Sequence, residues 1–376
     1  MMLKIGGCPL IDEAAGNGHS ATAMPLAASF VRTLAQTAET LLIALAGGTL
    51  FTLVGFPAGL ISGSVLAVAV AALLGRPVRV PVPLARTGYV LIGILLGAVV
   101  TPETVKGFTA WPVSIALVMV AALCMMLATA TYLRLVHGWD RLSALLGASP
   151  GSMTQVIALS TELGADLPAI AIVQTMRVLL LTTGIPAGLA LFGLVAPALP
   201  VVREPPGGSS LAEMALVVAV SCVTAIVFWC LRFPAGLLFG AMVGSGLLHG
   251  LGLVQAALPW WIGSASVLVL GALVGSRFAD QTFRLIGGYL GAAFGSFAVS
   301  FSVATLFVLI VAYFFPFPIA NIVVAFAPGA QDTMMVLALA LHLDPVYVAA
   351  HHVARFVVTA FSIAVAARRV AGREKR

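Results

Sequence analysis

The sequence predicts an all-α protein that crosses a membrane many times and is built from two copies of one unit. Apolar residues make up 61% of the 376 positions and charged residues only 9%, whereas a soluble domain carries about 25% charged residues. Several apolar runs approach the roughly 20 residues that a helix needs to cross a bilayer. They lack the alternation typical of membrane barrels. This composition excludes a water-soluble fold.

The duplication is visible as a spacing of 178 residues between unusual features. Each copy has a proline-glycine break, then an aspartate, then an arginine 11 residues after the aspartate. These are Pro150, Gly151, Asp166 and Arg177 in the first copy, and Pro328, Gly329, Asp344 and Arg355 in the second. The register extends upstream, where Gly93 and Gly97 are matched by Gly271 and Gly275. The most unusual chemistry of the chain is therefore present twice.

The copies divide the chain into five segments. A stretch rich in Pro, Gly and Ser at 200–210 is the linker between them. We expect an N-terminal tail at 1–31, membrane repeat 1 at 32–199, membrane repeat 2 at 211–367 and a basic C-terminal tail at 368–376.

The spans of the first copy are expected at about 33–55, 57–75, 87–101, 107–133 and 168–195. The leftover segment 140–163, and its counterpart 316–343, contains the Pro-Gly break. It is either a re-entrant hairpin or a broken span. A hairpin gives about five spans per copy and makes the two repeats inverted. A broken span gives six, with both copies facing the same way.

Charge placement favours the inverted arrangement. With ten spans and both termini in the cytoplasm, 15 of the 19 Lys and Arg residues are cytoplasmic, including Arg277 in the loop after the third span of the second copy. Lys106 and Arg203 then lie outside, and Arg177 and Arg355 are buried. Twelve parallel spans would leave 13 inside and four outside.

Each arginine is expected near the middle of the bilayer. Asp166 and Asp344 are typical residues for capping a helix start, and 11 residues at 1.5 Å each place the arginines roughly 16 Å into a layer about 30 Å thick. Hairpin tips at the Pro-Gly breaks reach a similar depth. The arginines either bond the free carbonyls of the break or contact a substrate or counter-ion. These roles do not exclude each other.

Polar residues follow each break and complete the predicted binding site. They are Ser152, Thr154 and Gln155 in the first copy, and Gln331, Asp332 and Thr333 in the second. With Arg177, Arg355 and the two Pro-Gly pairs, they form the substrate-binding set. Free helix-start amides beside a buried guanidinium favour an anionic group. Asp332 opposes that simple view, because it could neutralise an arginine, bind Na⁺ or carry a proton.

Two histidines directly precede the second arginine. His351 and His352 point to different faces of a helix, so one could face the site while the other packs. The first copy has Gln174 in place of His352. Asp332, His351 and His352 are the candidates for coupling to H⁺ or Na⁺. We expect no metal and no other cofactor, since no ligand cluster is visible. Three of the four cysteines fall in apolar runs and are expected to act as small inert hydrophobes.

The second copy resembles a known family in the stretch Val-Ala-Ala-His-His-Val-Ala-Arg-Phe. Together with the Pro-Gly breaks, this resembles the membrane AbrB family, which has a duplicated AbrB domain, over about residues 35–367. The resemblance implies a multi-pass protein of the bacterial inner membrane. Members are often labelled as ammonia monooxygenases or as regulators of gene expression.

The preferred hypothesis is a secondary transporter of a small polar or anionic solute, and not an enzyme. Its site would lie at the midplane between inverted repeats. A membrane sensor that regulates gene expression and a metal-dependent monooxygenase are the alternatives. The expected partners are the lipid bilayer and the solute, without nucleic acid. The glycine ladders indicate close helix packing or a homodimer face.

Overall fold

The computed structural model describes residues 26–100, 111–149, 156, 159–161, 163–195, 210–233, 235–256, 258–279 and 281–374. Within these ranges the secondary structure is helical and without strands. The helices of the first repeat are α2 (Leu26–Leu53), α3 (Gly59–Leu73), α4 (Val82–Gly97), α6 (Pro112–His137), α7 (Arg141–Ala148) and α9 (Leu167–Leu191). Those of the second are α10 (Leu211–Cys230), α11 (Gly236–Gly250), α12 (Trp260–Gly275), η2 (Ser276–Phe278), α13 (Phe283–Phe314), α14 (Ile319–Phe326), α15 (Gln331–Ala340) and α16 (Pro345–Glu374).

The protein is an all-α polytopic membrane protein. Seven of the described helices are long and apolar enough to cross a membrane, and α3, α4 and α11 are shorter apolar helices.

Helix α2 begins inside the segment expected to be an N-terminal tail, and α16 continues through most of the expected basic tail. Cys230 is disulfide-bonded, which the expectation of inert cysteines missed.

The duplication extends to backbone detail. Ala58 and Ala235 occupy equivalent positions before α3 and α11, and they have φ of 50° and 49°. A positive φ is uncommon for a residue with a side chain. The same strained turn therefore introduces the second helix of each repeat.

Each repeat packs on the other through equivalent helices. A Cβ atom on Gly93 or Gly97 of α4 would meet α11 within 2.4–2.5 Å, and one on Gly271 or Gly275 of α12 would meet α3 within 2.7–2.8 Å. The missing side chains let these helix backbones touch. Helix α4 thus packs on the partner repeat as α12 packs on the first.

Equivalent helices run antiparallel where they meet. Gly88 lies beside Leu270, whereas Leu95, about two turns further along α4, lies beside Gly263. Likewise, Tyr132 of α6 lies beside Gly295 of α13 and donates to the carbonyl of Gly291 over 3.4 Å, and His137, further along α6, lies beside Gly291. Two pairs of corresponding helices therefore have opposite directions.

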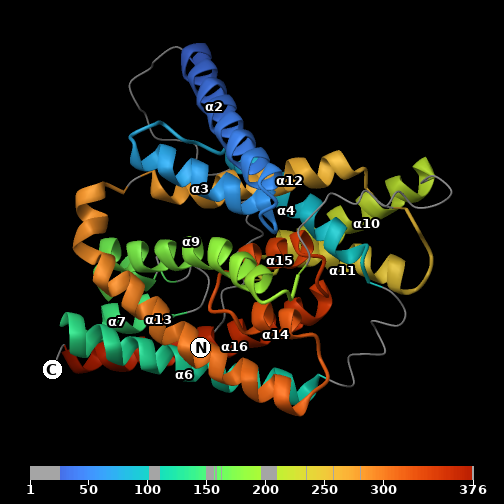
Figure 1. Ribbon diagram of the computed structural model, residues 1–376. Helices are drawn as coiled ribbons and strands as arrows, with labels where there is room; N and C mark the ends of the chain where they lie inside the picture. The colour runs from blue at the N-terminus through green and yellow to red at the C-terminus, as the bar shows by residue number, and fades with distance from the viewer. Residues whose placement is uncertain are drawn as a thin grey trace, which may run out of the picture.

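The closest packing divides the helices into two groups. The scaffold group contains α2, α3, α4, α10, α11, α12 and η2, and the hairpin group contains α6, α7, α9, α13, α14, α15 and α16. Each group takes corresponding helices from both repeats. The main contacts between the groups are made by α15 with α3, α4 and α12, and by α9 with α3. Figure 1 shows α15 at the centre, with α14 and α16 on one side and α4 and α12 on the other.

Candidate functional site

The break of the second repeat is a hairpin whose two ends meet. Helices α14 and α15 have eight and ten residues, which at 1.5 Å per residue is about 12 and 15 Å and too short to cross a bilayer. The amide of Asp344, after α15, donates to Oδ1 of Asn321 at the start of α14 over 3.3 Å. The chain therefore returns to the place where it entered, as a re-entrant hairpin does.

Arg355 fixes the tip of this hairpin. Its Nη1 donates to the carbonyl of Ala327, and its Nη2 donates to the carbonyl of Gly329 over 2.6 Å. The side chain is 0% exposed. Both carbonyls belong to the break between α14 and α15, where no helical amide can reach them. Bonding the freed carbonyls is thus one role of this arginine, and contact with a solute remains a prediction.

A cap at the start of α16 sets the position of Arg355 relative to the hairpin tip. Oδ1 of Asp344 accepts from the amides of Val346 and Tyr347 over 2.9 and 3.1 Å. Pro345 occupies the first helical position, where its missing amide costs nothing. The cap fixes where α16 begins, so the arginine three turns later reaches the tip.

The first repeat builds the same arrangement from different side chains. Asp166 caps α9 by accepting from the amide of Ala169 over 3.1 Å, and Nη2 of Arg177 donates to the carbonyl of Ser149 over 2.8 Å. The amide of Asp166 donates to Oγ of Ser143 over 2.9 Å, which closes this hairpin at its base. Ser149 is 178 positions before Ala327, so both arginines bond the same point of the fold. Both capping predictions are confirmed.

His352 and Gln174 make equivalent contacts although they differ in type. His352 Nε2 contacts the carbonyl of Val324 over 3.0 Å, and Gln174 Nε2 donates to the carbonyl of Leu146 over 3.0 Å. Val324 and Leu146 are also 178 positions apart. His352 Nδ1 contacts Nη2 of Arg355 over 2.8 Å. A carbonyl accepts and a guanidinium donates, so His352 is the neutral tautomer with its proton on Nε2.

His351 makes its polar contacts outside the hairpin. Its Nδ1 contacts the carbonyl of Tyr347 over 2.7 Å, and its Nε2 contacts Oγ of Ser114 on α6 over 2.9 Å. Its ring lies 4.0 Å from that of Tyr347, centroid to centroid. The two neighbouring histidines therefore serve different interfaces, and a role in proton relay remains a prediction for both.

The polar residues after the second break lie in two directions. Gln331 Nε2 donates to the carbonyl of His352 over 3.1 Å, toward α16. Asp332 faces the scaffold group, where its Oδ2 accepts from Tyr89 over 2.7 Å and from Arg277 over 3.3 Å. Thr333 is 2% exposed, and its hydroxyl has no partner in the described part of the chain. Asp332 thus neutralises an arginine, but it is Arg277 rather than Arg355.

The corresponding residues of the first repeat cannot be compared in the same way. Pro150, Gly151, Ser152, Thr154 and Gln155 lie outside the described residues. Their place in the site remains a prediction from the sequence.

The two buried arginines share one electrostatic environment. Arg177 is 5% exposed and Arg355 0%, and the two guanidinium groups lie within electrostatic reach of each other. Across the described residues, neither has a carboxylate within ion-pair distance, and the Nε of each has no hydrogen-bond partner. Two neighbouring buried cations without an anion are costly.

A family model described as "Transition state regulatory protein AbrB" matches residues 60–371 of this chain. The chain belongs to the AbrB family. The match covers both hairpins, both buried arginines and the scaffold helices from α3 onward.

Two relatives extend this AbrB-family match over most of the chain. One, from Bacillus subtilis (strain 168), is named "Uncharacterized protein YhjN" and is 24% identical over 351 residues, covering 84% of this chain and 88% of the relative. The other, from Escherichia coli (strain K12), is named "Putative regulator AbrB" and is 24% identical over 314 residues, covering 78% and 84%. Neither name states a substrate.

Sequence reasoning missed two members of the site in this AbrB-family chain. Arg277 was counted among the cytoplasmic loop residues, whereas it lies in η2 against Asp332 with 20% of its side chain exposed. Tyr89 was not singled out at all. The available signal was asymmetry, because Arg277, Asp332 and Tyr89 all lack a counterpart of the same type 178 residues away.

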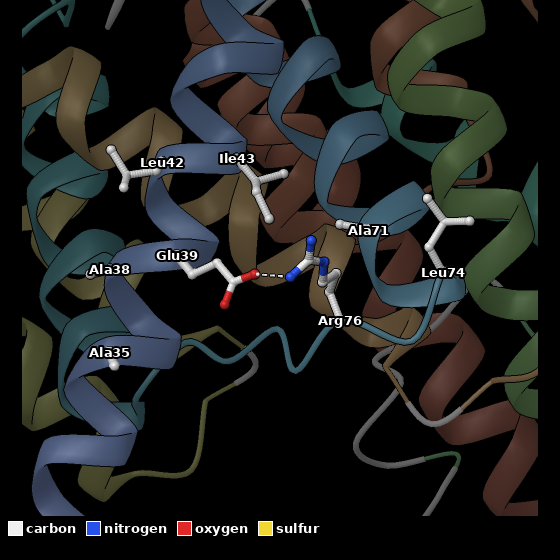
Figure 2. A pocket seen from close by; sticks show the side chains of 8 residues that line it. All are labelled: Ala35, Ala38, Glu39, Leu42, Ile43, Ala71, Leu74 and Arg76. Carbon is white, nitrogen blue, oxygen red and sulfur yellow. Dashed lines mark hydrogen bonds and ion pairs between the residues drawn. The ribbon is translucent and has the colours of Figure 1, made fainter.

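A second ion pair lies in a surface groove between α2 and α3 (Figure 2). Glu39 and Arg76 approach to 3.4 Å, and their side chains are 40% and 67% exposed. The groove has a volume of about 580 Å³ and is otherwise lined by apolar side chains. An exposed pair of this kind contributes about 0–1 kcal/mol, so the groove lacks the buried polar groups of the hairpin site.

Proposed function

We propose that this AbrB-family protein is a secondary transporter of a small anionic or polar solute, which binds between the two hairpin tips. The observation that carries the proposal is the pair of buried arginines, each bonded to the freed carbonyls of a matched hairpin. A small anion between them would offset their mutual repulsion. Irregular backbone at membrane depth is tolerated where it is buried in protein or lines a wet cavity.

The antiparallel packing of equivalent helices supports repeats that are inverted in the membrane. Inverted repeats allow alternating access, because each repeat can adopt the conformation of the other and so open the site to the opposite side. On this proposal the protein lies in the bacterial inner membrane with both termini in the cytoplasm.

An unequal interface between the two helix groups supports the same mechanism. Helix α3 packs on α9, where Ser62 donates to the carbonyl of Thr182 over 2.7 Å in a buried contact. The corresponding pair, α11 and α16, makes no comparable contact within the described ranges. A transporter open to one side is expected to have one such interface closed and the other open.

Solute flux in proteoliposomes tests the proposal. We expect uptake of at least one member of a panel of small carboxylates, phosphate and neutral polar solutes. We expect Arg177→Lys to reduce it, because a point charge does not reproduce the planar fork of arginine. Glu39→Gln, which alters the exposed ion pair, is the matched control and should transport normally. Folded protein that moves no member of the panel would contradict the proposal.

A membrane sensor of gene expression is the second candidate. The name of the Escherichia coli relative favours it, since that protein is described as a regulator. Deletion of the gene should then change transcription without changing solute uptake. Under the transport proposal, the deletion changes solute uptake, and any change in transcription follows from that. Metal analysis of purified protein separates both from a monooxygenase, which requires bound copper or iron.

A further inference from the structure

One carboxylate oxygen joins the two helix groups. Oδ2 of Asp332 on α15 accepts from the hydroxyl of Tyr89 on α4 over 2.7 Å and from Nη2 of Arg277 on η2 over 3.3 Å. Asp332 belongs to the hairpin group, and its two partners belong to the scaffold group. We call Asp332, Thr333, Tyr89 and Arg277 the Asp332 cluster.

The Asp332 cluster contains a site for one small occupant. A cavity of about 10 Å³ is lined by Asp332, Thr333 and Tyr89 together with apolar side chains, and this is about the space of one water molecule. The hydroxyl of Thr333 is buried without a partner in the described part of the chain. The side chains of Asp332 and Arg277 are 17% and 20% exposed. The carboxylate is therefore enclosed and still within reach of protons from water.

Protonation would remove the ion pair that links the two groups at Asp332. An ionised Asp332 accepts both hydrogen bonds at Oδ2, but a protonated carboxyl has no charge to hold Arg277 and gains a donor of its own. On the elements packed against α15, the other titratable or charged groups up to Ile363 are Arg177 on α9, Arg86 on α4, and Tyr347, His351, His352 and Arg355 on α16. Helices α3, α12 and α14 carry none. The permanently charged groups in this set are arginines. Within it, Asp332 is therefore the one carboxylate at the described interface between the hairpin group and the scaffold group.

We propose that Asp332 is a proton-binding site that controls the separation of the hairpin group from the scaffold group. With Asp332 ionised, Tyr89 and Arg277 hold the two groups together. With Asp332 protonated, Arg277 is released and the groups can separate. The use of this step, coupling solute movement to protons, rests on the proposed function, whereas the step itself occurs without a solute.

Thiol labelling at the interface tests this directly. Val336 lines the same cavity and is 1% exposed. In a chain whose free Cys124 and Cys222 are replaced by serine, Val336→Cys reports opening toward water. We expect slow reaction with a membrane-impermeant maleimide at mildly alkaline pH and reaction about tenfold faster at acidic pH, as the loss of a partly buried ion pair predicts. Each rate is divided by that of Leu253→Cys, an exposed position, to remove the effect of pH on the thiol.

Two substitutions remove the ion pair between Asp332 and Arg277 without a change of pH. Asp332→Asn and Arg277→Gln should each label fast at mildly alkaline pH and lose the dependence on pH. Glu39→Gln is the control, because it breaks an ion pair of similar length, 3.4 Å, within the scaffold group. It should label as the parent does.

The outcomes separate this inference from the transport proposal. A normalised rate that does not change with pH in the parent, or a slow rate in folded Asp332→Asn, overturns the proton site. If Asp332→Asn does not fold, the pH comparison in the parent decides alone. Absence of solute flux beside pH-dependent labelling contradicts transport and leaves the proton site standing.

Discussion

The two repeats agree around the buried arginines and differ at the interface between the helix groups. Both hairpins close at their base through a bond to the capping aspartate, and in both an arginine bonds the tip. The Ser62 contact lies within the first repeat, and the Asp332 cluster joins Asp332 and Arg277 of the second repeat to Tyr89 of the first. The residue types of this cluster are not repeated 178 positions away. The features that both repeats share therefore build the membrane fold. The features that are not repeated allow the two repeats to behave differently at the interface between the helix groups.

The largest expected effect comes from the arginines themselves. Arg355→Ala should lower the free energy of unfolding by about 3–5 kcal/mol, because the carbonyl of Gly329 and one histidine nitrogen lose the partner described for them and the carbonyl of Ala327 keeps only the amide of Gly329. Arg177→Ala removes one such bond among those described and should cost about 1.5–3 kcal/mol.

Thermal unfolding in nanodiscs measures both changes. Arg76→Ala is the control, since its side chain is 67% exposed and surface changes of this kind stay within about 0.5 kcal/mol. Equal and negligible losses at Arg177 and Arg355 would remove the arginines from the account of the fold.

The glycine contacts between the repeats come next. Gly97→Ala and Gly275→Ala should each destabilise the protein by about 1–3 kcal/mol, because the added carbon meets backbone atoms of the facing helix. The account requires similar costs at these equivalent positions. Gly188→Ala has open space around it and should be neutral or stabilising. A costly change at one site and a neutral one at the other would break the equivalence.

The smallest effects concern His352 and Gln174, which bond matched carbonyls. His352→Ala should cost about 1–2 kcal/mol, while His352→Gln should cost less, because glutamine already makes this contact in the other repeat. Unfolding midpoints of the two variants decide this. Equal damage by glutamine and alanine would show that the histidine ring has a role that its counterpart does not share.

Features carried by local sequence could be predicted, and features set by packing could not. The repeat, the capping aspartates and the position of each arginine beside its break follow from spacing along the chain. The contact of Arg277 with Asp332 does not, because the rule that assigns positive residues to cytoplasmic loops considers only their position between spans. Arg277 lies in η2 directly after α12, and its position depends on how α12 packs on α3 through Gly271 and Gly275. Tyr89 reaches Asp332 from α4, which packs closely on α11 through Gly93 and Gly97.

The side of the membrane on which equivalent loops lie is the most direct test of the account. Arg76 follows α3 and Leu253 follows α11 at the corresponding position, and both side chains are exposed. Single cysteines at these positions, in the background with Cys124 and Cys222 replaced by serine, can be labelled with an impermeant maleimide in right-side-out and inverted vesicles. Inverted repeats predict that Arg76→Cys and Leu253→Cys react from opposite sides. Reaction of both from the same side would mean parallel repeats and would contradict a site shared between two mirrored hairpins.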